Sequence, residues 1–486
     1  MLKTYLNAAT ERELEGIPAL PLSPEQVQEL TCLLEKPSDL YTNDFLLNLL
    51  QNRIPPGVDQ AAYVKATWLS AVAQGNTKCE LVSPFKATKL LGTMIGGYNV
   101  SALIELLQSN EDSLARCAAA GLSKTLLVYD AVNEVLDLAA KNQHAQKVVE
   151  SWANGEWFLS RPKISNEITV TVFKVEGETN TDDLSPATHA TTRPDIPLHA
   201  LAMLETRLPE GLEIISKLKN KKHPIAYVGD VVGTGSSRKS AINSVLWHIG
   251  ADIPYVPNKR SGGVIIGGKI APIFFNTAED SGALPIECDV SELNSGDVIT
   301  IRPHKGTIER RASDSDASKI IAKFELKPIT IVDEVQAGGR IPLLIGRALT
   351  DKVRGKLGYE PSDIFIRPRT SEESINGFTQ AQKIVGKACG LEGVYPGTSC
   401  EPLITTVGSQ DTTGPMTRDE MKELACLGFS ADLVMQSFCH TAAYPKPVDI
   451  KTQKELPDFI AERGGIALRP GDGIIHSWLN RMLLPD

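Results

Sequence analysis

The segment best equipped for chemistry is GTGSSRK at residues 233–239, which follows a strand-like run and opens a helix-like one. Glycines let the backbone turn tightly and come close to a ligand. Serines at a helix start satisfy free N–H groups, and these groups with the helix dipole favour a bound anion. The guanidinium group of Arg238 can bind a carboxylate through two hydrogen bonds. Ser236 or Ser237 beside that positive charge could act as a base. The plain alternative, which composition alone favours, is a simple N-cap with a solvated Arg-Lys pair.

A second polar set is Gln410, Asp411 and Thr412, directly after the strand-like run LITTVGS at 403–409. In α/β folds, ligands bind at the carboxyl ends of strands. An amide, a carboxylate and a hydroxyl at that point can hold a hydroxy acid in one pose. The alternative is an Asx-type turn that caps the following helix.

Two histidines and one arginine complete the candidate residues. His440 and His476 are the only histidines in residues 371–486, and an imidazole titrates in the range that suits proton transfer. Arg193 lies in TRPD at 192–195, where the alternative is a surface arginine beside a proline turn. A lone histidine is more often structural than catalytic. We give the remaining histidines that structural interpretation: His144, His189, His199, His223, His248 and His304.

The elements that must position these residues fall into three regions. Residues 1–160 predict helices throughout, because apolar residues recur at three and four in the runs at 43–54, 61–75, 100–109 and 120–141. Turn signals separate the runs, so paired helices of a HEAT-like solenoid are one interpretation and a plain helical bundle is the other.

Residues 161–370 predict a compact α/β or β/β/α domain. Strand-like runs occur at 168–177, 223–232, 262–275 and 298–306, with a helix candidate at 237–250. Residues 371–486 predict the start of a layered α/β domain. Its expected helices are GFTQAQKIVGKACG at 377–390, MTRDEMKELACLGF at 416–429 and ADLVMQSF at 431–438. Such a domain normally needs more strands than follow, so we expect a truncated or split polypeptide.

Composition supports several domains rather than one. A single core stops growing near roughly 250–300 residues, so a chain of 486 residues predicts about three domains. The net charge of −9 gives no global attraction to nucleic acid. No run of about 18 apolar residues predicts a transmembrane helix. The eight cysteines include no CxxC pair, and we expect them to be mostly buried apolar residues rather than a disulfide set.

Several ordered runs resemble the aconitase B family. GSSR at 235–238 is similar to the signature of the swivelling domain of aconitases and isopropylmalate dehydratases, and NTDDLSP at 180–186 is similar to the start of that domain. The runs at 55–66, 177–204, 229–247, 273–287 and 407–449 also resemble this family. The order, with the helical domain and the swivel domain first, is that of aconitase B, whereas other aconitases carry the swivel domain last.

The resemblance implies an aconitate hydratase that converts citrate to isocitrate through cis-aconitate, with 2-methylisocitrate dehydratase as a side activity. It implies that Ser236 is the base and that Ser237, Arg238 and Arg193 bind carboxylates of the substrate. It assigns substrate binding to Ser236 and to residues 410–412 as well, and active-site roles to His440 and His476. Cys439 stands where other aconitase branches carry an aspartate, which weakens the match at His440.

The resemblance also implies a [4Fe–4S] cluster, whose Lewis-acidic iron binds the departing hydroxyl. Family members hold it with three cysteines, two of them spaced as CxxC, in their C-terminal part. This sequence has no such pair. We therefore expect that the chain cannot bind the cluster in the family's way and is inactive alone.

Two other interpretations stay open. One is a binding module for RNA or protein, because relatives bind RNA without their cluster and the helical domain is implicated in association, including a homodimer. Its only dense basic run is KLKNKKH at 217–223, which is also typical of a solvated loop. The other is an isopropylmalate dehydratase relative, which fits the swivel motif but not the helical domain. A cytoplasmic protein is expected in each case.

Overall fold

The computed structural model describes residues 2–37, 40–57, 59–189, 192–235, 239–311, 318–367, 377–396, 398, 400–410, 431–439, 442, 447–478 and 481. Two compact units can be distinguished. The first holds Met1–Leu326 and Ile331–Phe365, and the second holds Lys327–Thr330, Ile366–Arg418 and Leu427–Asp486. Among the helices within these described ranges, none combines the length and hydropathy that a membrane crossing needs.

The first unit begins with a helical region, as predicted. Ser23 starts α2 with a capping box that involves Gln26, and the Thr42 and Ser83 side chains cap α3 and α5, so each start signal in the sequence satisfies backbone N–H groups. The helices of this region are α1 (Leu2–Leu14), α2 (Pro24–Glu35), α3 (Asn43–Asn52), α4 (Gln60–Ala73), α5 (Pro84–Leu91), α6 (Val100–Leu106), α7 (Asp112–Leu122), α8 (Ala131–Ala139), α9 (Gln143–Ala153) and α10 (Glu156–Leu159).

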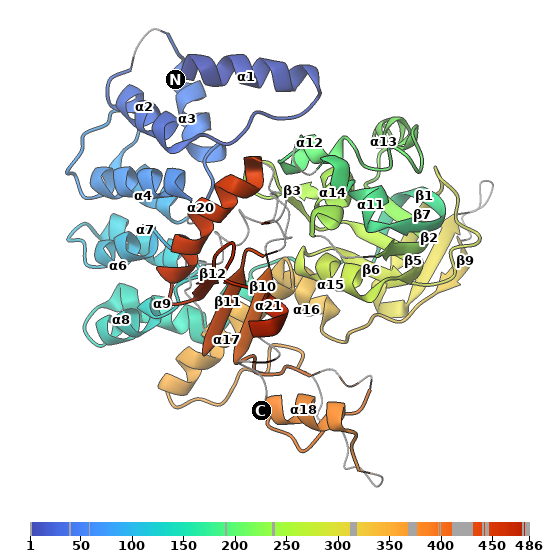
Figure 1. Cartoon of the computed structure of the whole chain (residues 1–486). Coiled ribbons are helices and arrows are strands. Elements are labelled where there is room, and N and C mark those ends of the chain that lie inside the picture. The colour runs from blue at the N-terminus through green and yellow to red at the C-terminus, as the bar shows by residue number, and fades with distance from the viewer. Residues whose placement is uncertain are drawn as a thin grey trace. The chain divides into compact units, whose positions relative to one another are not determined.

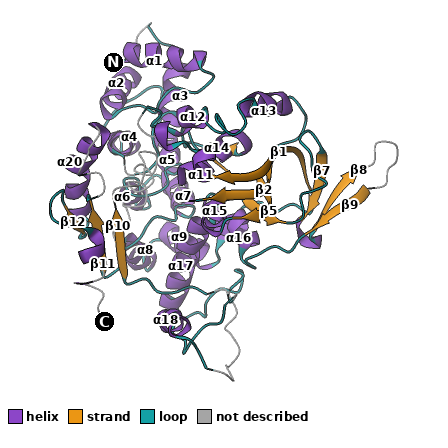
Figure 2. Ribbon diagram, turned by 45° about the vertical axis from the view of Figure 1, so that its right-hand side comes forward, coloured by secondary structure: helices purple, strands orange, loops and turns teal. Residues whose placement is uncertain are grey.

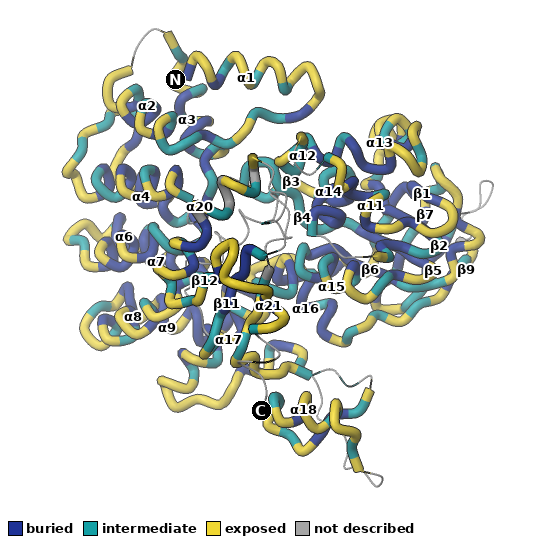
Figure 3. Tube along the Cα trace, viewed as in Figure 1, coloured by how far each residue is buried: buried dark blue, intermediate teal, exposed yellow. Residues whose placement is uncertain are grey.

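One apolar core joins α1 to α9, whereas Trp157 and Phe158 of α10 belong to a separate cluster. Each helix turns its leucines, valines and alanines inward, and Figure 3 shows buried stretches alternating with exposed ones along α2 to α9. The run at 120–141, which reads as one helical pattern, is divided in two. Helix α7 ends at Leu122 and α8 begins at Ala131, and Tyr129 between them has a left-handed φ of 43°.

A seven-stranded sheet follows in the first unit, in the order β6-β5-β2-β1-β7-β8-β9 (Figures 1 and 2). Strands β6, β5, β2 and β1 are parallel, and β7, β8 and β9 continue the sheet antiparallel. The strands are β1 (Ile168–Asn180), β2 (Ile225–Thr234), β5 (Val264–Ile270), β6 (Leu284–Glu287), β7 (Val298–Arg302), β8 (Thr307–Arg311) and β9 (Ser318–Lys323). A short ribbon of β3 (Ala251–Asp252) and β4 (Arg260–Ser261) stands apart from it.

Both faces of the parallel half of the sheet are covered, which explains its almost continuous apolar strands. One core contains Phe173, Tyr227 and Ile265 together with residues of the helices on that face. The other contains Val172, Val228 and Ile266. The helices and short 3-10 turns of this region are α11 (Thr181–Leu184), η1 (Ala187–His189), α12 (Ile196–Ala200), α13 (Gly211–Lys219), α14 (Lys239–Ile249), α15 (Pro272–Asp280), η2 (Pro303–Lys305) and α16 (Ile331–Ala337).

After the sheet the chain returns to the helical region through α17 (Arg340–Lys356). Leu349 and Val353 of this helix belong to the core of the N-terminal helices, and α17 contacts α9. The helical region and the sheet region therefore share packing within one unit. The boundaries expected at residues 160 and 370 remain predictions.

Two expectations from the sequence need correction. The strand-like run at 262–275 is a strand only to Ile270, and its PIFF part begins α15. Proline is favoured at the first helical position, because the backbone N–H that it lacks would have no partner within the helix there. Cysteines are not mostly buried: Cys32 is exposed and the other six described ones are half-buried. Cys79, for example, lies at the edge of the helical core, where its thiol donates to the Leu34 carbonyl oxygen.

The second unit contains a parallel sheet in the order β10-β11-β12, formed by Thr406–Gln410, Leu433–Ser437 and Ile466–Leu468. The prediction of a helix at 431–438 was wrong. Met435, Gln436 and Ser437 are buried in the central strand, and periodicity cannot distinguish such a short buried run from a helix. The helices are α18 (Gln380–Ala388), as predicted, α20 (Pro447–Ala461) and α21 (Ile475–Ser477). The helix predicted at 416–429 lies outside the described residues.

Candidate functional site

The GSSR motif has the strand–turn–helix context that the sequence suggested. Strand β2 runs in parallel between β1 and β5 and ends at Thr234, and α14 starts at Lys239. Ser236, Ser237 and Arg238 themselves lie outside the described residues. Their roles therefore remain predictions, while the elements on both sides are established.

Glycine is required at the end of β2. Gly233 has a φ of 74°, and a Cβ added there would lie 2.2 Å from Cγ of Phe274 in α15. Gly235 has a φ of 87°, and its added Cβ would be 3.5 Å from the Thr181 hydroxyl. The first glycine thus permits close packing on α15, and both permit the left-handed turn.

The NTDDLSP segment reaches the same end of the sheet. Asn180 pairs with Thr234 in the register of β1 and β2. Asn180 and Asp183 form a capping box at the start of α11, in which each side chain accepts from the other residue's backbone N–H at 2.8 Å. Two of the sequence segments that carry the family resemblance therefore meet at the carboxyl ends of parallel strands, where α/β folds bind ligands.

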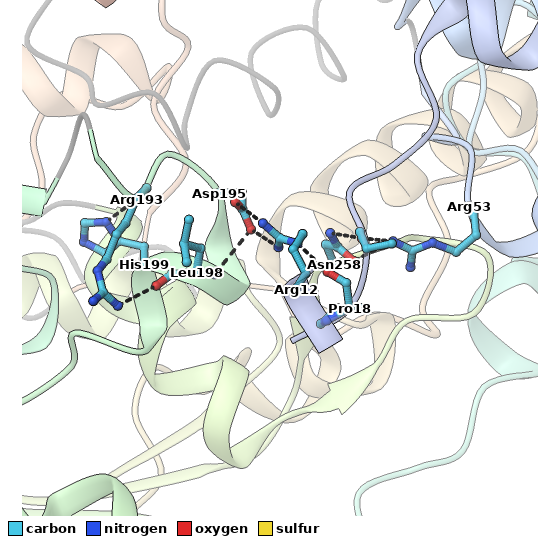
Figure 4. A network of polar contacts seen from close by, with 9 residues as sticks. Arg12, Pro18, Arg53, Arg193, Asp195, Leu198, His199 and Asn258 are labelled. Carbon is cyan, nitrogen blue, oxygen red and sulfur yellow. Dashed lines mark hydrogen bonds and ion pairs between the residues drawn. The ribbon is translucent and has the colours of Figure 1, made fainter. Parts of the chain in front are cut away.

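Arg193 is half-buried in the loop that leads into α12. Its guanidinium Nη1 donates to the Leu198 carbonyl at 3.4 Å. Asp195 caps α12 by accepting from the Leu198 N–H at 3.3 Å, and Arg12 of α1 donates to both Asp195 carboxylate oxygens at 3.0 and 2.7 Å. Figure 4 shows this path from Arg12 through Asp195 to the Arg193 loop.

A buried polar chain links this loop to the start of α14. The His199 ring donates through Nδ1 to the Arg193 carbonyl oxygen at 3.0 Å, since that oxygen can only accept. Its Nε2 lies 2.8 Å from the Ser185 hydroxyl oxygen, and Ser185 donates to the Ser240 hydroxyl at 2.8 Å. His199 and Ser185 are each 2% exposed and Ser240 is 9% exposed. One histidine thus connects residues from three separate sequence segments.

The sequence interpretation of His199 was structural, and it overlooked this connection. Nothing in the residue types marks His199 apart from His189 or His223, because its side-chain partner Ser185 comes from the separate segment at 180–186. The signal that could have found it is its position four residues after Asp195, a residue type that is favoured as an N-cap and that caps α12 in the structure.

His248 of α14 is neutral near pH 7. Burial lowers the pKa of its imidazole to about 4, although the hydrogen bond from Nε2 to the Ala200 carbonyl, 2.9 Å long, opposes that shift. Because Ala200 ends α12, this bond ties α12 to α14 a second time. His248 has a structural role in this geometry, as the sequence suggested.

The second unit places one candidate residue, Gln410, at the end of a strand. Gln410 is the last residue of β10 and pairs with Ser437 at the end of β11. His476 is exposed in α21, which contacts β10, and its neighbour Ile475 packs with Met435 and Leu468. Asp411, Thr412 and His440 lie outside the described residues, so of this set the structure relates only the elements of Gln410 and His476.

Comparison with known proteins now bears on these motifs. The family model described as "Aconitate B N-terminal domain" matches residues 4–158, and the one described as "Aconitate hydratase 2 N-terminus" matches residues 170–378. "Aconitate hydratase B" of Synechocystis sp. strain PCC 6803 is 66% identical over 486 residues, all of this chain. The protein of the same name from Escherichia coli strain K12 is 59% identical over all of this chain.

The chain belongs to the aconitate hydratase B family.

It corresponds to the N-terminal part of that family, as the descriptions of both family models state, and it spans 55% of the Synechocystis protein and 57% of the Escherichia coli protein. A solved structure of 3-isopropylmalate dehydratase (leuD) from Methanocaldococcus jannaschii is 21% identical and covers 39% of this chain and 99% of its own, with a TM-score of 0.29. A likeness of that TM-score adds nothing to the assignment.

Membership in the aconitate hydratase B family implies an iron–sulfur cluster in the intact enzyme. Within the described ranges, no three His, Cys, Asp or Glu side chains come together as metal ligands. The described thiols lie in both units, from Cys32 in α2 to Cys439 after β11, and the contact between Cys389 and Cys400 brings together two thiols rather than the three that the cluster needs. The described part of the chain therefore does not fit the cluster.

Proposed function

We propose that the protein containing this chain is an aconitate hydratase that interconverts citrate and isocitrate through cis-aconitate. The observation that carries the proposal is the 66% identity, over the whole chain, to a protein named aconitate hydratase B. The convergence of the motif turn and the NTDDLSP segment at one end of a parallel sheet supports it. The same site is proposed to accept 2-methyl-cis-aconitate as a second substrate.

The chain's own residues divide the work in this proposal. Ser236 removes the proton on the carbon beside a substrate carboxylate, and Ser237 and Arg238 hold carboxylates at the start of α14. Backbone N–H groups at a helix start and a bidentate guanidinium suit that task. Arg193 binds a further carboxylate from the loop before α12.

Residues of the second unit have roles of their own in the proposal. Gln410, Asp411 and Thr412 fix the hydroxy-acid part of the substrate at the end of β10. His440 and His476 handle protons, for which an imidazole is suited near neutral pH. Because the described residues do not fit the iron–sulfur cluster, no step is assigned to it here.

The helical region has a separate role in the proposal. We assign to α1–α10 a HEAT-like arrangement that offers a surface for association, including a homodimer, in a cytoplasmic protein. A module that binds RNA or protein is the second candidate function. Against general RNA binding, Lys217 of the basic run pairs with Glu213 at 2.6 Å and Lys221 donates to the Gly296 carbonyl at 2.8 Å.

The test is a hydratase assay with citrate and cis-aconitate after anaerobic reconstitution with iron and sulfide. We expect turnover when this chain is combined with a C-terminal segment of an aconitate hydratase B, and none from this chain alone. In the active mixture, Ser236→Ala should lower kcat by about 10²–10⁴-fold, as loss of a general base does, and Arg193→Ala should mainly raise KM.

The matched control is Ser291→Ala, an exposed serine distant in sequence from the motif, which should leave both constants unchanged. An inactive mixture whose cluster has formed, as read from its visible absorbance, would contradict the proposed function. Turnover by this chain alone would contradict the assignment of the remaining catalytic groups to another segment.

A further inference from the structure

Ser185, His199 and Ser240 form a buried hydrogen-bonded chain in the first unit, next to the motif. Its members come from the segment at 180–186, from α12 and from the first turn of α14. These are the elements that adjoin Arg193 and residues 236–238. A change in the position of His199 would thus reach both proposed substrate-binding segments at once.

Burial makes this chain of hydrogen bonds sensitive to the loss of any one of its three side chains. His199 and Ser185 are 2% exposed, so water cannot readily replace a missing hydrogen-bond partner. His199 also fixes the Arg193 backbone from one side, through the bond from Nδ1 to the Arg193 carbonyl oxygen. Without that donor, the Arg193 carbonyl group would be held less rigidly.

The helical region holds the same loop from the other side. Arg12 has a side chain 13% exposed and grips Asp195, 20% exposed, with two hydrogen bonds. The Arg12 Nε also donates to the Pro18 carbonyl at 2.7 Å, which orients the guanidinium. A half-buried, bidentate pair of this kind has defined geometry, unlike a typical exposed ion pair.

A second contact between the helical region and the sheet region provides a comparison. Arg53 donates to the Asn258 amide oxygen at 3.1 Å, and Asn258 donates to the Ala19 carbonyl at 2.9 Å. Figure 4 shows this contact near Arg12 but separate from the Arg193 loop. It joins the same two regions without touching His199 or Asp195.

We propose that His199 is a positioning residue that sets Arg193 and the start of α14 for substrate, and that Arg12 of the helical region fixes the same loop through Asp195. The inference rests on the proposed function for its kinetic consequence, whereas its geometric part stands on the hydrogen bonds alone. The helical region is then part of the catalytic apparatus and more than an association surface.

The experiment compares variants of the full-length, cluster-loaded enzyme. His199→Ala should raise KM for citrate by about 10-fold or more, because a small displacement of a substrate-binding group is costly. His199→Asn places an amide N–H near the position of Nδ1 and should restore KM to within about 3-fold of wild type. A role in general stability alone would not separate these two variants by KM.

Asp195→Asn isolates the contribution of the helical region. Asparagine is as good an N-cap as aspartate, so α12 keeps its cap while the ion pair with Arg12 is lost. We expect about a 3-fold to 5-fold rise in KM from Asp195→Asn, the same from Arg12→Met, and no further rise in the double variant. Asn258→Ala is the matched control and should leave KM unchanged.

Hydrogen exchange gives a second measurement that needs no activity. His199→Ala should accelerate exchange of the amides at 192–198 and in the first turn of α14, but not in β7 or β8. Equal KM for His199→Ala and wild type would overturn the proposal, as would unchanged exchange at 192–198. If the wild-type holoenzyme does not turn over citrate, the proposed function fails and the exchange result alone decides the geometric part.

Discussion

At the scale of single residues, the environment of a side chain determines its protonation. Lys65 of α4 is 1% exposed in the helical core, and burial lowers the pKa of its ammonium group to about 8. The same lysine in an unfolded chain titrates near 10.5. Between these values the unfolded state binds the proton and the folded state does not.

The free energy of unfolding therefore rises with pH between about 8 and 10.5, and below pH 8 the burial of Lys65 lowers it by the full amount. Lys65→Met should remove that penalty and raise the free energy of unfolding at pH 7 by about 2–3 kcal/mol, with the gain fading toward pH 10. Urea unfolding at pH 7 and pH 10, followed by the circular dichroism of the helices, measures it. Lys147→Met, at an exposed site of α9, is the control and should show no such gain; an equal gain there would refute the explanation.

At the scale of elements, α17 shows how one helix uses two glycines differently. Glycine inside a helix normally costs about 1 kcal/mol relative to alanine. A Cβ at Gly346 would lie 2.2 Å from Cζ2 of Trp157 in α10, whereas a Cβ at Gly355 would meet nothing within 4 Å. Gly346 therefore permits α17 to pack closely on the helical region, and Gly355 has no such task.

Matched alanine substitutions in this helix should act in opposite directions. Gly355→Ala should stabilise the first unit by up to about 1 kcal/mol through helix propensity. Gly346→Ala should destabilise it by about 1–3 kcal/mol, since Trp157 must move or the helices must separate. Thermal denaturation of both variants is the measurement, with Trp157 as a fluorescent reporter. Stabilisation by Gly346→Ala would show that the packing of α17 on Trp157 is loose.

The same scale shows why part of the fold was predictable. Helices such as α2 and α18 carry capping residues and periodic apolar positions, so local sequence determines them. Strand β11 was predicted as a helix because LVMQS has no periodicity of its own. Only its pairing with β10 and β12 makes it a strand.

At the scale of the whole molecule, net charge governs which partners are attracted from a distance. The chain carries −9 at pH 7, and its one dense basic run, 217–223, is partly engaged through Lys217 and Lys221. The net negative charge of the chain therefore opposes the electrostatic attraction of RNA. This consideration favours the enzyme over the RNA-binding module.

We accordingly expect a dissociation constant weaker than about 1 µM for short single-stranded RNA at physiological salt, with steep further loss as salt rises. Fluorescence anisotropy of a labelled RNA at low and physiological salt measures both quantities. Glu213→Gln, which releases Lys217, is the matched variant and should tighten binding at most slightly. Tight, salt-insensitive binding by the unmodified chain would instead support the binding module.

The candidate site divides in a similar way between sequence and structure. The motif at 233–239, the capping box of Asn180 and Asp183, and the family resemblance depend on neighbouring residues, and the sequence by itself determined them. Tertiary structure alone decided that Ser185 meets both His199 and Ser240, and that Arg12 reaches Asp195, 183 residues away along the chain. The physical reason is that a hydrogen bond between distant segments leaves no periodic or local trace, and arises only when packing of the cores brings those segments together.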